Sequence, residues 1–296
     1  MERTQSEEIR CIEKSSQEYP EKLKHYKGMP EKLYVKGGLP DPKRPAAAVV
    51  GARMCSTYGR IQAFRFARVL AEAGVQIISG MASGIDAEGH KGAMEGRMPT
   101  WAVLGNGADV CYPAGNKGLY NRIIREKGGI ISEYPPGTLP RSYYFPARNR
   151  IIAGFSDLVL VVEAKEKSGS LITAQCALEQ GKAVFALPGP VNEELSRGCH
   201  QLIYDGAGIA YTPEVLLEEL GINYENTIKS EGKKNLGLAS DLNMVYSCLD
   251  LRPKTRDVLA QESGFSAEKT GRILVELGLL GMVREIGRHY YIKNQT

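Results

Sequence analysis

The chain has 296 residues, of which 43% are hydrophobic and 24% are charged, and its formal net charge is +4. A single hydrophobic core rarely grows beyond about 250 residues, so this length predicts one large domain and one small one. A net charge of +4 is too small to identify a polyanionic ligand, so the local distribution of charge must decide. No stretch approaches the ~18 apolar residues of a membrane span, and we expect a soluble protein without a membrane partner.

The N-terminus and the cysteines indicate the compartment. The segment MERTQSEEIRCIEKSS has neither the apolar core nor the small-residue cleavage site of a secretory signal. The six cysteines, at positions 11, 55, 111, 176, 199 and 248, lack the close pairs of a zinc site or redox motif. We therefore expect reduced thiols, no metal and a cytoplasmic protein.

Short apolar runs alternate with amphipathic stretches from residue 46 onward. The runs occupy 46–50, 75–79, 101–104, 130–132, 157–163 and 183–187, and helices are predicted between them, for example over Tyr58–Ala73, Ile85–Glu95 and Ser170–Gln180. Such alternation predicts an α/β fold over 45–222, an extended Rossmann-like domain with a doubly wound, mostly parallel sheet. Residues 1–44 are interpreted as a packed N-terminal entry segment.

A second pattern follows a polar stretch at 223–240 that we interpret as a linker. Residues 241–296 contain three predicted helices, Leu242–Leu251, Thr255–Ser263 and Ser266–Leu279, and two short strands joined through Gly287-Arg288. This order predicts a small C-terminal winged-helix domain. From 239 to 296 there are eight basic and seven acidic residues, a net charge of +1 that is weak for a duplex reader. Protein contact or oligomerisation is at least as well supported for this domain.

Glycines and hydroxyl residues gather at the predicted strand ends. Ligands of open α/β sheets bind beyond the carboxyl ends of the strands, where loop amides and helix N-termini point outward. A glycine in such a turn can simply provide the backbone conformation that the turn requires. For any single turn, this explanation is as well supported as ligand binding. Several such turns together favour an anion such as phosphate. The turn GARMCSTYG is not GxGxxG, and GxxxxGK[ST] does not occur, so no nucleotide cofactor is expected.

The segment from Tyr134 to Phe155 has a local charge of +3, because it contains three arginines and no acid. It is predicted as a loop between two strands, with Tyr143, Tyr144 and Phe145 interleaved among Arg141, Arg148 and Arg150. Arginines that reach phosphates beside aromatic rings that stack on bases are typical of proteins that bind single strands without sequence choice. The alternative is a Pro-rich surface loop whose aromatic residues close the core.

Four charged or titratable residues near strand ends are candidate catalysts: Asp86, His90, Glu133 and Glu163. Carboxylates in such turns more often accept backbone amides, and a helical histidine is more often a packing residue, so structural roles are favoured. The alternative function is that of a nucleotide phosphoribohydrolase-like enzyme on a related fold. SGSLITAQCALEQ keeps the threonine and glutamate of such an element as Thr173 and Glu179, but it lacks the paired leading glycines.

Several motifs, in order, resemble the DNA-processing protein A (DprA or Smf) family: VVGARMCSTYGR, ISGMASGIDAEGHKGA, FPARNRIIAG and SGSLITAQCALEQGK. The resemblance spans roughly residues 19–220 and, more weakly, the C-terminal domain. It implies a protein that binds single-stranded DNA, usually as a homodimer, and loads the RecA recombinase during natural transformation, without catalysis or cofactor. The DNA contacts that it implies are Gly51, Arg53, Gly80, Ser83, Gly84, Ile85, Asp86, Phe145, Arg148, Asn149, Arg150, Ser168, Gly169, Ser170 and Thr173.

Three features depart from the family pattern. Many members carry an N-terminal helical domain, whereas about eighteen residues precede Tyr19 here, and we expect any role of that domain to be lost. Ser83 stands where a basic or aliphatic residue is common, which predicts a weaker phosphate contact. His200 follows Gly198-Cys199 where many relatives have Gly-Thr-Asn, which puts contacts from that turn in doubt.

Overall fold

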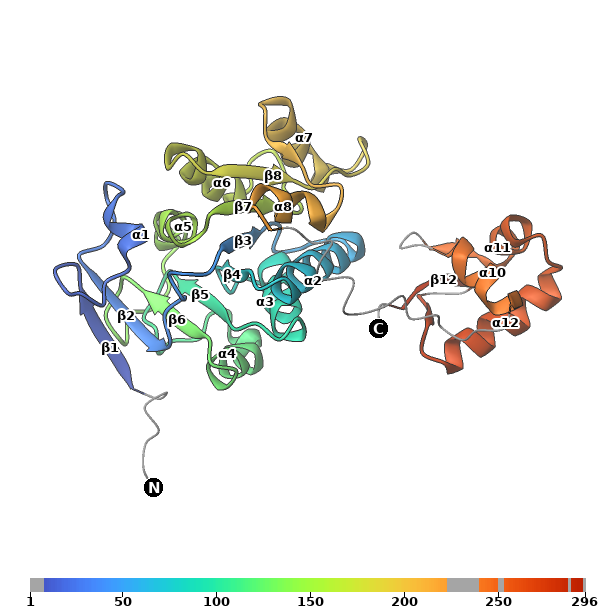
Figure 1. The fold of residues 1–296 in the computed structure, drawn as a ribbon, viewed down its shortest axis with the longest axis horizontal. Helices are drawn as coiled ribbons and strands as arrows, with labels where there is room; N and C mark the ends of the chain where they lie inside the picture. Colours follow the sequence, from blue (N-terminus) through green and yellow to red (C-terminus); the bar gives the residue numbers. More distant parts are fainter. Residues whose placement is uncertain (1–7, 223–239, 250–252, 287–288, 295–296) are drawn as a thin grey trace, which may run out of the picture. The chain divides into compact units, whose positions relative to one another are not determined.

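The computed structural model describes residues 8–222, 240–249, 253–286 and 289–294. The chain divides into two compact units, residues 1–227 and 228–296, each with its own hydrophobic core (Figure 1). The predicted linker at 223–240 lies outside the described residues, except for Ser240 at the start of a helix. No helix of the described residues is both long and apolar enough to cross a membrane.

The first unit contains a nine-stranded sheet of order β1-β2-β6-β5-β4-β3-β7-β8-β9. Neighbouring strands from β6 to β9 in this order pair in parallel, whereas β2 pairs antiparallel with β6 and with β1. The six strands predicted from residue 46 onward are confirmed as β3 to β8. Residues before position 45 supply β1 and β2, so the predicted entry segment forms one edge of the same sheet. The strands are β1 (Ile9–Glu13), β2 (Lys32–Gly37), β3 (Ala46–Val50), β4 (Gln76–Ser79), β5 (Thr100–Leu104), β6 (Gly129–Ser132), β7 (Leu158–Val161), β8 (Ala183–Ala186) and β9 (Gly208–Ile209).

Helices cover both faces of this sheet, because its central strands are apolar on both sides. In β3, Ala46, Ala48 and Val50 face one core, and Ala47 and Val49 face the other. The first face carries α1 (Glu21–Lys24), α5 (Tyr144–Phe155), α6 (Gly169–Glu179) and α7 (Glu194–Tyr204). The second carries α2 (Thr57–Glu72), α3 (Ile85–Glu95), α4 (Lys117–Arg125) and α8 (Pro213–Glu219). The Rossmann-like, doubly wound prediction is therefore confirmed (Figure 1).

Helix α5 corrects the prediction of a loop between β6 and β7. Ile151, Ile152 and Phe155 recur at helical spacing and are buried against the sheet. Pro146 lies in the first turn, where no amide donor is required, so it does not prevent the helix. The proline-rich start of the segment concealed this helical periodicity.

The second unit consists of three helices and a three-stranded antiparallel sheet of order β10-β12-β11. The three predicted helices are confirmed, with Ser266 as the N-cap whose hydroxyl accepts the Lys269 amide at 3.2 Å. The winged-helix assignment is consistent with this order and stays a prediction, and Gly287-Arg288 lies outside the described residues. The elements are α10 (Ser240–Cys248), β10 (Lys254–Thr255), α11 (Arg256–Ser263), α12 (Ala267–Leu279), β11 (Val283–Glu285) and β12 (Tyr290–Lys293).

Candidate anion site at the carboxyl edge of the sheet

An open pocket of about 280 Å³ lies at the carboxyl ends of β3, β4 and β7, next to the start of α6. Most of the predicted site residues meet there, although they come from the segments after three different strands and from α5. Its predicted lining residues are Gly51, Arg53, Asp86, Phe145, Arg148, Asn149, Ser168, Gly169, Ser170 and Thr173. Val50, Ala82, Ser142, Pro146 and Ile152 complete the wall and had not been predicted.

A second pocket of about 230 Å³ adjoins the first, and Arg53, Phe145 and Arg148 line both. Gly80 and Ser83 line this second pocket, as do Met54, Tyr112 and Pro113, which sequence reasoning missed. Tyr112-Pro113 follows the loop after β5. The rule that ligands bind beyond the carboxyl ends of the strands could therefore have found it. Among the predicted residues, Gly84, Ile85 and Arg150 line neither pocket.

Arg148 places a positive charge in the wall of the pocket. Its side chain comes from α5, is only 5% exposed, and donates from Nη1 to the carbonyl oxygens of Gly80, at 2.8 Å, and of Val103. Burial lowers the pKa of Arg148 to about 10, so the guanidinium remains protonated at neutral pH. It forms no ion pair with the described residues, and its Nε is buried without a hydrogen-bond partner. The nearby Asp86 carboxylate favours the charged form of Arg148 but forms no direct ion pair with it, and burial outweighs this effect, so an anion bound against the guanidinium would be stabilised.

Asp86 is the acidic residue of the pocket wall, and its hydrogen bonds are those of a structural carboxylate. Its Oδ2 accepts the amides of Gly80 at 3.1 Å and of Ala82 at 3.4 Å, which fixes the turn after β4. Burial raises the pKa of Asp86, and the neighbouring Arg148 opposes that shift. The structural role favoured from sequence therefore agrees with the contacts of this residue.

Three of the strand-end glycines are required by packing. A Cβ atom on Gly51 would lie 2.7 Å from Ile85 Cγ1, and one on Gly80 would lie 2.4 Å from Arg148 Nη1. Gly84 has a φ of +78° and would meet the Ala52 carbonyl oxygen at 2.4 Å. Gly169 differs, because a Cβ atom added to it would meet no atom within 4 Å. Of these four glycines, Gly169 alone leaves open space at its Cβ position, and it lines the pocket.

The N-terminus of α6 opens onto the pocket, because Ser168, Gly169 and Ser170 line it. Ser168 is its N-cap, and its hydroxyl accepts the Ser170 amide at 3.4 Å. Asn149 donates to the Gly169 carbonyl oxygen at 3.0 Å and so holds this end against α5. At α2, by contrast, the Glu163 carboxylate already accepts the Ser56 amide at 2.9 Å. The partial positive charge of α6 therefore remains available to a ligand.

An aromatic platform stands at the mouth of the pocket. The Phe145 ring stacks on Tyr112, with centroids 5.5 Å apart, and the exposed Arg53 guanidinium lies 5.3 Å from the Phe145 centroid. Tyr143 and Tyr144 instead contact each other, and neither lines these two pockets. Of Tyr143, Tyr144 and Phe145, Phe145 alone lines them.

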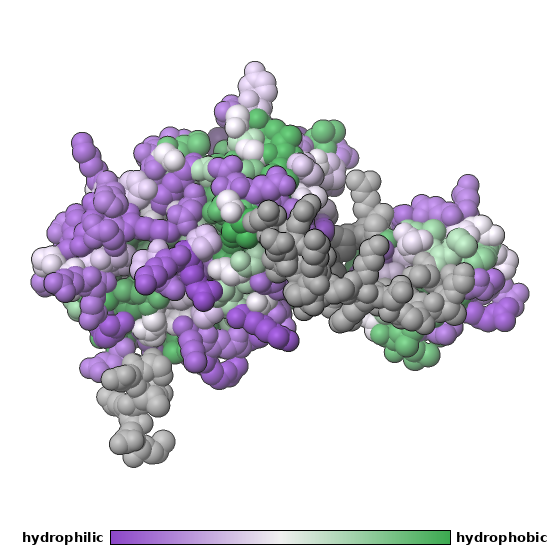
Figure 2. Space-filling model, in the orientation of Figure 1, coloured by the Kyte–Doolittle hydropathy of each residue, from purple (hydrophilic) through white to green (hydrophobic). Residues whose placement is uncertain are grey.

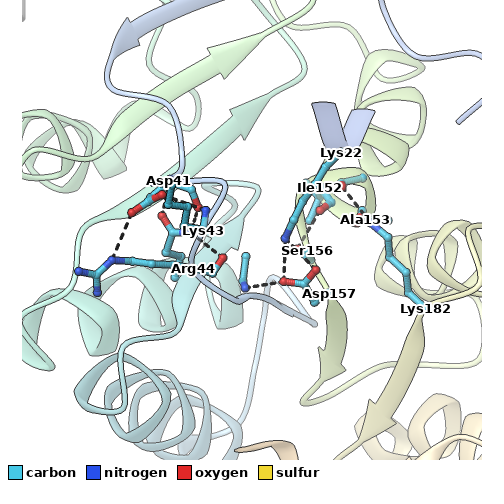
Figure 3. A network of polar contacts seen from close by, with 12 residues as sticks. Lys22, Asp41, Lys43, Arg44, Ile152, Ala153, Ser156, Asp157 and Lys182 are labelled. Carbon is cyan, nitrogen blue, oxygen red and sulfur yellow. Dashed lines mark hydrogen bonds and ion pairs between the residues drawn. The ribbon is translucent and has the colours of Figure 1, made fainter. Parts of the chain in front are cut away.

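The other end of α5 is fixed by a polar network (Figure 3). Lys182 Nζ donates to the carbonyl oxygens of Ala153 at 2.5 Å and Gly154 at 2.8 Å, and Lys22 pairs with Asp157 at 2.7 Å (Figure 3). Burial lowers the pKa of Lys182 to about 7. These contacts hold the helix that carries Phe145, Arg148 and Asn149.

Arg150 was predicted to neutralise phosphate, but its guanidinium pairs with Glu133 and lines neither pocket. Its Nη2 lies 2.6 Å from Glu133 Oε2, and its Nη1 lies 2.9 Å from Glu133 Oε1, in a bidentate pair on the outer side of α5. Its Nε also donates to the Gly28 carbonyl oxygen at 2.7 Å. The observed contacts of Arg150 therefore anchor α5 to the neighbouring segments.

The candidate catalysts do not come together as a catalytic site. Asp86 lines the pocket, whereas Glu133 pairs with Arg150 and Glu163 binds the N-terminus of α2. His90 is fully buried with its Nδ1 2.7 Å from Thr100 Oγ1, and burial lowers its pKa to about 3. The alternative enzyme element is also separated, since Thr173 lines the pocket but Glu179 ends α6 outside it.

Fold and site define a Rossmann-like protein with an open cationic pocket that combines helix amides, hydroxyls and an aromatic ring. Residues 10–221 match the family of DNA recombination-mediator protein A, and this chain belongs to that family. It is 38% identical to protein Smf of Escherichia coli (strain K12) over 286 residues, which is 94% of this chain and 76% of that protein. It is 44% identical to DNA processing protein DprA of Streptococcus pneumoniae over 201 residues, 68% of this chain and 71% of the relative.

Two solved structures of the family superpose on the chain. DprA from Streptococcus pneumoniae gives a TM-score of 0.68 at 40% identity and covers 73% of this chain and 75% of its own. DNA processing protein A from Helicobacter pylori, described in its single-stranded DNA binding mode, gives 0.64 at 30% identity and covers 73% and 97%. The family resemblance found from the sequence motifs is confirmed.

Proposed function

We propose that this chain binds single-stranded DNA through the pocket at the carboxyl edge of its sheet. The observation that carries the proposal is the buried, protonated Arg148, which lines an open pocket and has no carboxylate within ion-pair distance among the described residues. A backbone phosphate would pair directly with this guanidinium, which the nearby Asp86 carboxylate offsets only in part. The Helicobacter pylori relative, whose single-stranded DNA binding has been described, supports the same ligand class.

In this proposal each part of the site has a separate task. The amides at the start of α6 and the hydroxyls of Ser168, Ser170 and Thr173 bind phosphate oxygens, while Arg53 and Arg148 neutralise charge. The Phe145 ring packs on a base or sugar. Asp86 fixes the turn after β4, in which Gly80 and Gly84 allow close packing, and Ile85 packs on Gly51. Arg150 anchors α5 through Glu133.

The finer role follows from membership of a recombination-mediator family. We infer that the DNA-bound protein loads the RecA recombinase onto single strands in the cytoplasm during natural transformation, and that it does so without catalysis. Adding the protein to single strands coated with single-strand-binding protein should shorten the lag before RecA hydrolyses ATP. An unchanged lag would contradict loading, and base release from a nucleoside monophosphate would favour the enzyme alternative.

We also infer a homodimer formed through the β9 edge of the sheet. Among the described residues β9 pairs on one side only, with β8. Tyr204 and Tyr211, which flank β9, are 86% and 69% exposed, and Ile209 is exposed in the strand itself. An unpaired edge with exposed aromatic residues is a surface that a second copy would cover. Tyr211→Asp should lower the molar mass of the assembly in solution from that of a dimer toward that of a monomer. An unchanged molar mass would contradict this interface.

Fluorescence anisotropy at several salt concentrations tests the DNA site. If Arg53 and Arg148 each neutralise one phosphate, log affinity should fall with log salt at a slope of about −1.4 per protomer, since single strands contribute about −0.7 per contact. Arg53→Ala should weaken binding of all sequences alike and flatten the slope by about 0.7. Arg125→Ala is the matched control, because Arg125 is exposed at the end of α4 and lines neither pocket. Equal affinities of the two variants would contradict the proposed site.

A further inference from the structure

Helix α12 of the second unit has one buried face and one exposed face. Thr270, Ile273, Leu274 and Leu277 are buried, and the last three belong to the core of this unit. On the other side, Val275 is 66% exposed, Leu279 is 85% exposed, and Leu280 just beyond the helix is 54% exposed. Figure 2 shows apolar surface at the lower margin of this unit, where α12 ends. Exposed apolar residues grouped on one helix mark an interaction surface.

Two glycines lie on the same exposed side of α12 without an internal reason. A Cβ atom on Gly278 would meet nothing closer than the Val283 carbonyl oxygen at 3.9 Å, and one on Gly271 would meet Arg256 Cδ at 3.4 Å. The unit would therefore tolerate alanine at both positions, and alanine is the better helix former. At about 100° per residue, Gly271 and Gly278 fall within about 60° of Val275. The Arg256 side chain packs at the Cβ position of Gly271, whereas Gly278 leaves open space beside exposed Val275 and permits another helix to approach closely.

The charges on this face do not suit a nucleic acid. Glu268 and Arg272 form an exposed pair at 3.1 Å, and Glu276 adds a second acid. The exposed Arg256 side chain beside Gly271 adds a second base, so two acids and two bases leave no excess positive charge to attract phosphate groups. A second copy of the same face offers an equal number of opposite charges in return.

We propose that α12 packs antiparallel against α12 of a second copy of this chain, about a two-fold axis at Val275. Gly278 lies three residues from Val275 and leaves open space, so the two helices can approach closely on that side of the axis. Arg272 lies three residues before the axis and Glu276 one residue after it. Their levels differ by about 3 Å, within reach of an arginine side chain, so two Arg272–Glu276 pairs form across the axis. The surface is thus self-complementary, as an isologous interface requires.

Sedimentation velocity of the full chain over a range of concentrations tests this proposal. All variants are also combined with Tyr211→Asp, so that association through α12 is measured separately from the dimer proposed at β9. Arg272→Glu should weaken α12 association about tenfold or more, because it opposes Glu276 of the other copy. The exchange Arg272→Glu with Glu276→Arg should restore it to within about threefold of the wild-type value.

Two further variants separate association from folding. Gly278→Leu should abolish α12 association while the thermal unfolding midpoint stays equal or rises, since leucine is a better helix former than glycine. Arg284→Glu, an exposed charge reversal on β11, is the matched control and should change neither quantity. Association that is unchanged by Arg272→Glu and Gly278→Leu would overturn the proposal, as would a Tyr211→Asp chain that stays monomeric at every soluble concentration.

Discussion

Gly169→Ala tests the DNA site at the point where a ligand must come closest to the backbone. The substitution adds one methyl group to the first residue of α6, where no atom lies within 4 Å of the added carbon. The fold should accept it, and because alanine favours helices, the free energy of unfolding should stay constant or rise by up to about 1 kcal/mol. A phosphate bound to the α6 amides would be displaced by the methyl group. Loss of one charged hydrogen bond of about 1.5–3 kcal/mol corresponds to a Kd increased roughly ten- to a hundredfold.

Anisotropy with a labelled single strand measures the affinity, and urea unfolding measures the stability of the same preparation. Gly118→Ala is the matched control, because Gly118 is the second residue of α4, also has open space at its Cβ, and lines neither pocket. It should change stability by a similar amount and leave affinity constant. A Gly169→Ala protein that binds DNA as tightly as the wild type would refute phosphate binding at the start of α6.

Three other substitutions separate structural residues from binding residues. Gly84→Ala should lower the free energy of unfolding by about 2 kcal/mol or more in urea titrations, because the φ of Gly84 is +78° and the added Cβ atom would collide with a backbone oxygen. Wild-type stability of this variant would disprove the steric collision. Arg150→Met should cost about 1–3 kcal/mol of stability through loss of the Glu133 pair, yet leave the anisotropy-measured affinity within about twofold; a large affinity loss would restore Arg150 to the DNA site. His90 has a folded pKa of about 3 against an ordinary 6.5, so the unfolded chain binds the extra proton and stability falls as pH decreases from 7. The loss should reach about 2 kcal/mol at about pH 5 and be absent in His90→Met, and equal pH slopes in urea titrations would contradict it.

The sequence was sufficient for the parts of the molecule that depend on local pattern. The apolar runs from residue 46 predicted β3 to β8, because strands buried on both faces must be apolar throughout. Turn residues at the strand ends predicted Gly51, Arg53, Ser168, Gly169 and the neighbouring site residues, because parallel strands bring their carboxyl ends to one edge. The motifs also predicted the family, which residues 10–221 confirm.

Only the tertiary structure decided what each predicted residue does at that edge. Arg148 and Arg150 are two residues apart on α5, so helical geometry sends their side chains in different directions, one into the pocket wall and one to Glu133. Whether a glycine serves packing or a ligand depends on atoms distant in sequence: Gly80 makes room for Arg148, whereas Gly169 leaves space open. The sequence by itself determined which residues gather at the edge of the sheet. Burial and partners, which arise from contacts between distant segments, decided which of them line the open pocket and which are held by other side chains.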